Sequence, residues 1–248
     1  MPRDRHVNRA LLLQRDPSLP PSLALDPGAC PILRPDSAMK ERLERHDPPL
    51  PLCPGCPRDG GGVCPVRAFL DDAAADGAAL EIDVGAGYGR FSRGHAAANP
   101  GIRLFAVEQD EARVARTDVA ARRAGLRNVG YLAGEARYAL EYCVRPGSAS
   151  AVFVLFPDPW PKDRHARNRF FRPANIELVH RALRPGGLLH AATDNAAYFA
   201  QMLETLAADP RFEPAPPYSR GEDERTDFER KFLSQGKTVN LASWRKRE

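Results

Sequence analysis

Hydrophobic and polar positions change their pattern along the chain at about residue 78. From there, short apolar runs alternate with stretches in which apolar residues recur every three or four positions. This alternation is typical of a mainly parallel sheet with helices on both faces, so we predict an α/β fold with a doubly wound sheet. The predicted strands are 79–84, 102–107, 128–132, 151–156 and 188–192. The predicted helices are one that ends at 98, one from Asp110 to 124, one that begins at 136, and two that cover 173–183 and 196–208.

Residues 1–65 have a different composition, with many prolines and glycines and few periodic apolar positions. Such a segment buries little apolar surface, so we expect an extended, irregular N-terminal arm in which only 39–46 has a helical pattern. Residues 66–248 then form the folded domain. The arm also carries cysteines that could bind zinc or an iron–sulfur cluster, but their spacing matches no common zinc finger and favours free thiols and no metal. These cysteines are Cys30, Cys53, Cys56 and Cys64.

Charge and hydropathy narrow the class of protein only slightly. No apolar run approaches the roughly 20 residues that span a bilayer, and the N-terminal stretch does not resemble a signal peptide. We therefore expect a cytoplasmic protein that does not bind membranes, either a monomer or a homodimer. The net charge of +4 permits nucleic-acid binding without arguing for it, because clustering on one face matters more.

A glycine-rich turn directly follows the first predicted strand. Gly85, Gly87 and Gly89 allow a ligand to approach the backbone, but their spacing differs from the G-x-G-x-x-G pattern of dinucleotide sites. Glu81, with Asp83 on the same strand, suits a neighbouring cation, and Glu108 at the end of the next strand suits the paired hydroxyls of a ribose. S-adenosylmethionine supplies both a cation and a ribose, whereas glycines that merely pack a turn would leave Glu108 unexplained.

The segment 153–169 carries the second candidate site. A buried-type strand ends in Pro157-Asp158-Pro159-Trp160, and the prolines restrict the backbone around Asp158 at the carboxyl end of the strand. Ligands bind at that end in open α/β sheets. Basic residues follow at once, and together with the carboxylate and the indole they suit a nucleobase with phosphates nearby. The alternative is a proline-rich turn with a solvated basic loop. The basic residues are Lys162, Arg164, His165, Arg167 and Arg169.

Several motifs together resemble the bacterial tRNA (guanine-N7-)-methyltransferase family. They occur in the family's order over about 78–248, and the most specific are FPDPWPK, LH-x-ATD and T-x-FE. The resemblance implies a Rossmann-like class I methyltransferase that moves a methyl group from S-adenosylmethionine to guanine N7 in the tRNA variable loop. The motifs are LEIDVGAGYG from Leu80, AVE from Ala106, FPDPWPKDRH from Phe156, LRPGGLLHAATD from Leu183 and RTDFE from Arg225.

Roles for individual residues follow from these two candidate sites and, for Thr226 and Glu229, from the resemblance. Asp158 is expected to act in catalysis and to border the cofactor, and Asp194 to contact guanine unless it caps the helix that follows. On pattern alone, Thr226 and Glu229 would lie on the surface. The expected cofactor-binding residues are Glu81, Gly85, Gly87, Glu108, Glu135 and Asp158, and the expected substrate-binding residues are Lys162, Arg164, Arg167, Arg169, Asp194, Thr226, Asp227, Phe228 and Glu229.

The chain departs from the family pattern at a few positions. Glu135 stands where the family usually has Asp, Asp227 where Lys is common, and Asp163, Ala166 and Asn168 thin the basic run. The change at Glu135 concerns a contact near the adenine of the cofactor, whereas Asp227 and the thinned basic run could weaken RNA affinity or shift the substrate range. Two alternatives therefore stay open: a methyltransferase for another nucleobase nitrogen or a small molecule, and a non-catalytic RNA-binding relative.

Overall fold

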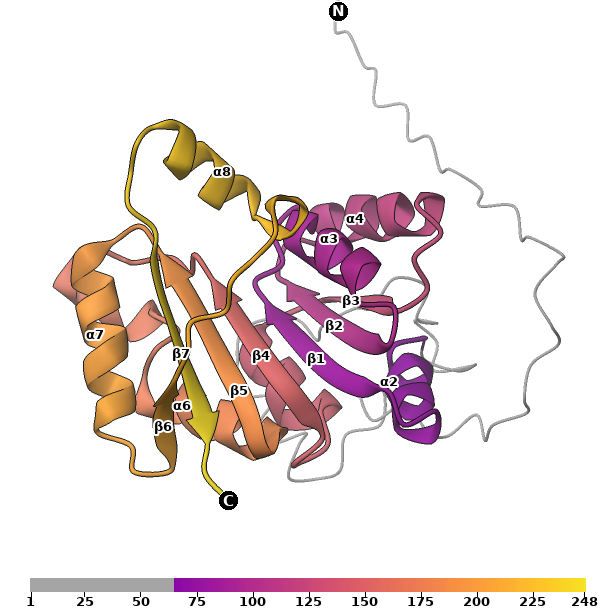
Figure 1. Ribbon diagram of the computed structural model, residues 1–248, viewed down its shortest axis with the longest axis horizontal. Helices are drawn as coiled ribbons and strands as arrows, with labels where there is room; N and C mark the ends of the chain where they lie inside the picture. The colour runs from indigo at the N-terminus through magenta and orange to yellow at the C-terminus, as the bar shows by residue number, and fades with distance from the viewer. Residues whose placement is uncertain (1–64) are drawn as a thin grey trace, which may run out of the picture.

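A single seven-stranded sheet organises the computed structural model, which describes residues 65–248 (Figure 1). The strand order is β3-β2-β1-β4-β5-β7-β6, and only β7 runs antiparallel to its neighbours. The order reverses between β1 and β4, and crevices at such switch points bind ligands. The strands are β1 (Ala79–Val84), β2 (Ile102–Glu108), β3 (Val129–Ala133), β4 (Ala149–Leu155), β5 (Leu183–Thr193), β6 (Phe212–Ala215) and β7 (Asn240–Lys246).

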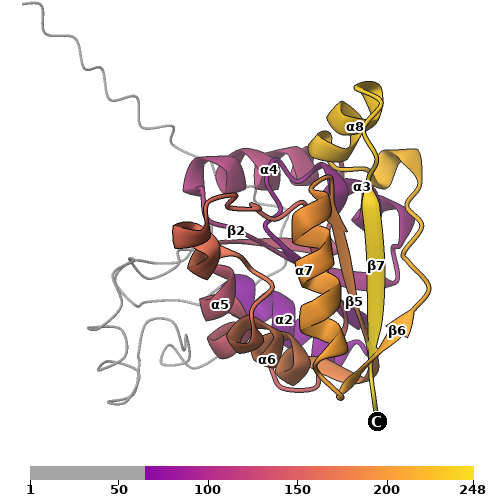
Figure 2. The ribbon, with the colours of Figure 1, turned by 90° about the vertical axis from the view of Figure 1, so that its left-hand side faces the viewer.

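Helices cover both faces of this sheet, as Figure 2 shows from the side. On one face α2, α5, α6 and α7 pack against the larger apolar core, and on the other α3 and α4 cover β1–β3. The segment after β6 crosses the second face in front of β4 and β5 (Figure 1). The helices are α2 (Pro65–Ala75), α3 (Arg90–Ala98), α4 (Glu111–Arg123), α5 (Ala136–Tyr138), α6 (Pro173–Ala182), α7 (Ala196–Ala207) and α8 (Asp227–Ser234), with shorter turns η1 (Ala139–Cys143), η2 (Asp163–Asn168) and η3 (Glu222–Glu224).

Local sequence explains where the central elements begin and end. The β4 strand is apolar on both faces, as expected for a parallel strand covered by helices on each side. Asp110 caps α4 by accepting a hydrogen bond from the Arg113 amide, and Gly125 follows the helix with a positive φ of 73°. Because β1 to β5 pair in parallel, their carboxyl ends, and so the loops that could bind a ligand, lie at one edge of the sheet.

The predicted α/β fold with a doubly wound, mostly parallel sheet is confirmed, including its five parallel strands. The glycines Gly186 and Gly187, which were expected to lie between a helix and a strand, instead belong to β5. The strands β6 and β7 and the helix α8 were not predicted. The expected N-terminal arm, its helical stretch at 39–46 and the four cysteines of the arm lie outside the described residues.

Residues 65–248 contain neither a membrane-spanning helix nor a metal-binding cluster. No helix in that range is both long and apolar enough to cross a membrane. Nor does that part of the chain contain a group of three or more His, Cys, Asp or Glu side chains placed to hold a metal ion.

Candidate functional site

The glycine-rich turn after β1 presents open space beside its backbone. Gly85 and Gly87 have φ of 80° and 57°, and a Cβ at either position would meet no other atom within 4 Å. Gly89 is different, because its Cβ would lie 2.0 Å from the side chain of Thr117 on α4. Gly89 therefore lets α4 pack closely, whereas Gly85 and Gly87 leave room in which a ligand could approach the chain.

Glu108 lies at the end of β2 and is fixed by the neighbouring backbone. Its carboxylate accepts hydrogen bonds from the amides of Gly87 at 2.9 Å and Asp110 at 3.1 Å. The Arg113 guanidinium lies 3.7 Å from the same carboxylate and 5.0 Å from the ring centre of Tyr88. The side chain is 12% exposed, so the group is oriented yet still accessible. A carboxylate held in this way can accept hydrogen bonds from the paired hydroxyls of a ribose.

The two acidic residues of β1 have different environments. Asp83 is buried, and it accepts a hydrogen bond of 2.6 Å from the Ser92 hydroxyl. Burial raises the pKa of Asp83 to about 6, partly offset by the bond from Ser92. Glu81 is 17% exposed and lies 2.5 Å from Nε2 of His95 on α3. Of the two carboxylates expected beside a cation, Asp83 is thus enclosed in the core and Glu81 is partly exposed.

Glu135 follows β3 and directly precedes α5. The residue is half-buried, and its side chain makes no capping hydrogen bond to the helix. Glu135 thus lies at the carboxyl edge of the sheet.

The Pro-Asp-Pro-Trp turn after β4 is bounded by two residues in the left-handed region. Phe156 has φ of 54° and Trp160 has φ of 40°, and neither is a glycine. Conformations of this kind cost about 1–3 kcal/mol each and persist where surrounding contacts impose them. Asp158 lies exposed at the middle of this strained turn. Such strain is frequent at ligand sites.

Arg169 holds this turn rather than pointing freely to solvent. Its guanidinium donates to the carbonyls of Pro159 at 2.8 Å and Trp160 at 3.0 Å, and to Oε1 of Gln201 at 2.5 Å. The guanidinium also lies 5.7 Å from the ring centre of Tyr198. The expectation that Arg169 binds a phosphate is therefore corrected, because its donors are engaged in fixing the backbone around Asp158.

The other expected phosphate-binding residues lie on the surface of the same loop. Lys162, Arg164 and Arg167 are exposed, on or next to the short helix η2. The Arg164 Nε lies 3.3 Å from Nε2 of His165, whose ring contacts Trp160 edge-on at 5.7 Å. Three exposed cations therefore follow the turn that carries Asp158 within the same loop.

Asp194 follows β5 and is not the cap of α7. Asn195 has that role, because its Oδ1 accepts a hydrogen bond of 2.9 Å from the Tyr198 amide. The Asp194 carboxylate lies 3.6 Å from Nζ of Lys237, in the loop after α8. The helix-cap alternative for Asp194 is thus excluded, and its carboxylate stays 26% exposed at the edge of the sheet.

Residues 226–229 begin α8, which lies above the carboxyl ends of the strands (Figure 1). Thr226 caps this helix by accepting from the Glu229 amide at 3.0 Å. Glu229 is buried and accepts two hydrogen bonds of 2.9 Å from the guanidinium of Arg220. The surface position that the pattern suggests is therefore wrong for Glu229. Asp227 and Phe228 are exposed, Phe228 at 55%.

Side-chain contacts join α8 to the base of the strained turn. Phe232 of α8 lies 5.8 Å from Phe156 and 6.0 Å from Phe228, between ring centres. Lys237 contacts both the ring of Phe232 and the carboxylate of Asp194. By the strand ends that they follow, the expected residues fall into two groups on either side of the β1–β4 switch point. One group comprises Glu81, Gly85, Gly87, Glu108 and Glu135; the other comprises Asp158, Asp194, the η2 cations and the start of α8.

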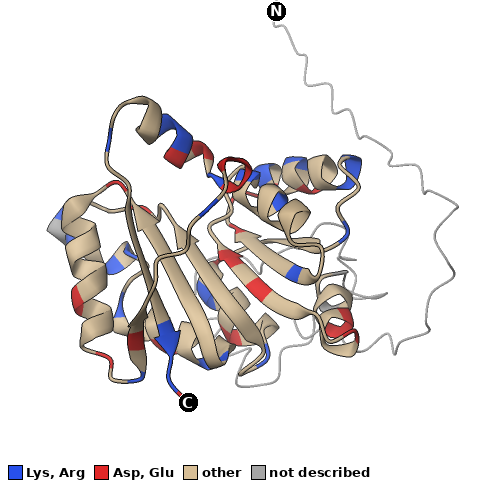
Figure 3. Ribbon diagram, viewed as in Figure 1, with Lys and Arg blue, Asp and Glu red and all other residues tan. Residues whose placement is uncertain are grey.

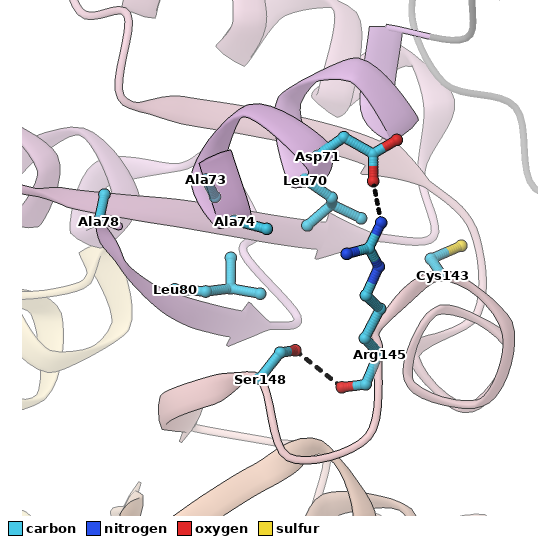
Figure 4. Close-up of a pocket in the computed structure, with 9 residues that line it drawn as sticks. All are labelled: Leu70, Asp71, Ala73, Ala74, Ala78, Leu80, Cys143, Arg145 and Ser148. Carbon is cyan, nitrogen blue, oxygen red and sulfur yellow. Dashed lines mark hydrogen bonds and ion pairs between the residues drawn. The ribbon is translucent and has the colours of Figure 1, made fainter. Parts of the chain in front are cut away.

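A small cavity lies at the opposite end of the sheet and contains none of these residues (Figure 4). Its water-accessible volume is about 70 Å³, and its lining is mainly apolar side chains of α2 and β1 together with Arg145 and Ser148. That volume is far below the several hundred Å³ of sites for drug-sized ligands. This cavity is therefore too small for a ligand of that size.

Comparisons with known proteins support the family and the fold. A family described as "Putative methyltransferase" matches residues 78–242. A 16S rRNA (adenine(1408)-N(1))-methyltransferase from Catenulisporales acidiphilia has the same fold, with a TM-score of 0.52 and 19% identity over 76% of this chain and 94% of that one.

Two curated relatives share more of the sequence. The tRNA (guanine-N(7)-)-methyltransferase of Mycobacterium avium is 33% identical over 216 residues, which cover 85% of this chain and 82% of the relative. The protein of the same name from Treponema pallidum is 32% identical over 75% of this chain and 76% of its own length. The chain belongs to the tRNA (guanine-N7-)-methyltransferase family.

Proposed function

We propose that the protein transfers the methyl group of S-adenosyl-L-methionine to N7 of a guanine in the variable loop of tRNA. The observation that carries the proposal is the strained turn around Asp158, held by Arg169 beside the β1–β4 switch point. Membership in the family supports the choice of substrate.

The residues on the β1–β2 side fit the cofactor. Glu108 offers a fixed carboxylate to the ribose hydroxyls, and Gly85 and Gly87 leave space beside the backbone. Glu81 offers a negative charge to the cationic methionyl end. Bound S-adenosylmethionine would supply an electrophilic methyl group on its sulfonium.

The residues on the β4–β5 side fit a guanine. Guanine N7 has a free lone pair at neutral pH, so this reaction requires alignment of the base rather than removal of a proton. The carboxylates of Asp158 and Asp194 can accept hydrogen bonds from N1–H and N2–H₂, on the edge of the base away from N7. The same charges would stabilise the positive charge that develops on the methylated base.

The exposed groups around the turn fit the rest of the nucleic acid. Lys162, Arg164 and Arg167 are placed to contact phosphates, and Phe228 offers an exposed ring on which a base could stack. A tRNA substrate implies a cytoplasmic enzyme, and one copy of residues 65–248 contains all of the groups named. We therefore infer that a monomer suffices, while a homodimer would also be compatible.

Two assays test this proposal. Wild-type protein should bind S-adenosylmethionine by calorimetry and should produce N7-methylguanosine on unmodified tRNA, as detected by nucleoside analysis. A protein that binds the cofactor but methylates a different atom or a small molecule would support the other methyltransferase class. A protein that binds tRNA but no cofactor would support a non-catalytic relative.

Two variants separate the roles of the two groups. Asp158→Ala should abolish methylation while cofactor affinity stays within a few-fold of wild type. Glu108→Gln should weaken cofactor binding by roughly 1.5–3 kcal/mol, the value of hydrogen bonds to a charged group. Near-normal turnover of the first variant, or an unchanged dissociation constant in the second, would refute the corresponding assignment.

A further inference from the structure

His95 of α3 lies between two carboxylates from distant parts of the chain. Its Nε2 is 2.5 Å from Glu81 on β1, and its Nδ1 is 2.6 Å from Glu224 in η3. Only a doubly protonated imidazole can donate to both partners at once. Burial alone would lower the pKa of His95, but the bonds to Glu81 and Glu224 outweigh it, so the pKa lies above its usual value. The charged ring therefore bridges two negative groups that would otherwise repel each other.

The ring is fixed by its neighbours as well as by its charge. Phe91 stacks on it with ring centres 5.1 Å apart, and Phe153 of β4 meets it nearly edge-on at the same distance. Tyr218 lies 3.1 Å from Nδ1 on a third side. Because these rings restrict rotation of the imidazole, both of its nitrogen atoms stay aimed at their carboxylates.

The far end of this bridge is a closely docked segment. A Cβ at Gly94 would lie 2.1 Å from the carbonyl oxygen of Asp223, so η3 packs directly on the backbone of α3. Figure 3 shows this acidic turn against α3. Glu224 also accepts hydrogen bonds from the Tyr218 hydroxyl at 2.8 Å and the Gly221 amide at 3.0 Å. Burial alone would raise the pKa of Glu224, but the hydrogen bonds from His95, Gly221 and Tyr218 together outweigh burial, so the pKa is lowered.

The bridge therefore joins the two groups of the candidate site. Glu81 belongs to the group assigned to the cofactor, and only Arg225 separates η3 from Thr226 and α8 in the group assigned to the base. We propose that His95 is a positioning residue that fixes Glu81 for the cationic end of the cofactor and, through Glu224, holds the segment leading to α8 in register with it. This inference rests on the proposed function.

Binding of S-adenosylhomocysteine, measured by calorimetry, tests the bridge. His95→Gln and Glu224→Gln should each weaken binding by roughly tenfold or more, the scale of one lost charge-assisted hydrogen bond. The double variant should be no weaker than His95→Gln alone, because both changes break the same bridge. His190→Gln is the matched control: this second buried histidine bonds the Ser243 hydroxyl at 2.7 Å, and its loss should leave binding within about twofold.

A pH series distinguishes positioning from a purely structural role. Wild-type affinity should fall as pH rises through the raised pKa of His95, because the neutral ring can donate to only one carboxylate. Glu224→Gln removes one of the negative charges that raise the pKa of His95, so the fall in affinity of this variant should occur at lower pH. Dividing wild-type affinity by that of His95→Gln removes the titration of the ligand's own amino group. Other groups near the ring are Asp83 on β1, His190 on β5, Tyr218 and Asn99.

Each outcome of these measurements either supports or overturns the positioning role of His95. The positioning role would be overturned, while the proposed function stands, if Glu224→Gln bound with wild-type affinity. It would likewise be overturned if the effects of the two single variants multiplied in the double variant. A wild-type protein that does not bind S-adenosylhomocysteine would overturn both. Should His95→Gln not fold, the affinity of Glu224→Gln and the shift of its pH profile against wild type decide alone.

Discussion

Asp83 carries a carboxyl group in an environment that disfavours its charge. It is 2% exposed, and burial raises its pKa from 3.8 to about 6. A folded-state pKa above the unfolded value means that this group stabilises the protein below about pH 4. The contribution is lost as pH rises through about 6, and the loss amounts to roughly 3 kcal/mol by neutral pH.

Asp83→Asn should therefore be more stable than wild type at neutral pH, and the advantage should shrink towards pH 4. The amide can still accept the hydrogen bond from Ser92. Urea denaturation at several pH values between 4 and 7 measures the difference in free energy of unfolding. Ser92→Ala provides the matched comparison, because loss of its hydroxyl should move the titration to higher pH. Parallel curves for wild type and Asp83→Asn would contradict the raised pKa.

A substitution at Arg169 tests whether this residue positions Asp158 for turnover. Arg169→Lys keeps the charge but loses the planar fork that binds the carbonyls of Pro159 and Trp160. Turnover should fall by roughly 10- to 100-fold through misplacement of Asp158, with cofactor affinity unchanged. Steady-state kinetics measure this, and Arg184→Lys, exposed at the other end of β5, should behave as wild type. A flatter salt dependence of tRNA binding in Arg169→Lys would instead indicate a phosphate contact.

The individual residues that the sequence predicts well are those set by local backbone. Gly85, Gly87 and Glu108 follow strands directly, so their places at the sheet edge could be predicted from the strands themselves. The partners of Arg169, and the pairing of Glu229 with Arg220, depend on how separate segments meet in space. His95 and Glu224 are 129 residues apart, and no local pattern connects them.

At the scale of elements, we expect the loop that contains η2 to contribute to the salt dependence of tRNA binding. Replacing Lys162, Arg164 and Arg167 with Ala should weaken tRNA binding and reduce the slope of log affinity against log salt by roughly 0.7–0.9 per lost phosphate contact. Filter-binding titrations over a salt series measure the slope. Cofactor affinity should not change, because the glycine loop and Glu108 lie at other strand ends.

A double variant at the opposite end of the sheet provides the control. Arg245 donates to the Gly186 carbonyl, and Arg247 lies 3.9 Å from Glu213, both near the amino end of β5. Arg245→Ala combined with Arg247→Ala should leave the slope as in wild type. A slope that changes in this double variant but not in the triple variant of the η2 loop would place the tRNA away from Asp158.

Elements differ in how far their sequences reveal them. The five parallel strands are recognisable because they are buried on both faces and so form continuous apolar runs. β6 is only four residues long and contains a proline, and β7 mixes polar and basic residues with Trp244. The apolar residues of α8 stand in an otherwise polar segment, which is why the pattern suggests a surface turn.

At the scale of the whole molecule, the seven strands and the core residues of the described part of the chain lie within residues 66–246. Deletion of residues 1–60 should therefore leave a domain that unfolds cooperatively and binds S-adenosylmethionine. Thermal denaturation followed by circular dichroism, with calorimetry of the cofactor, measures both properties. A broad, non-cooperative transition in the truncated protein would show that the deleted residues contribute to the core.

The position of β7 has a consequence for how the chain folds. It lies between β5 and β6, although β6 precedes it in the sequence, so β5 has no hydrogen-bonded neighbour on that side until β7 arrives. Pairing over about fifty residues is slow compared with local helix formation, and an uncovered strand edge can pair with another chain. A partly folded intermediate with an open β5 edge should therefore be the species most prone to aggregate, and yields on refolding should fall as protein concentration rises.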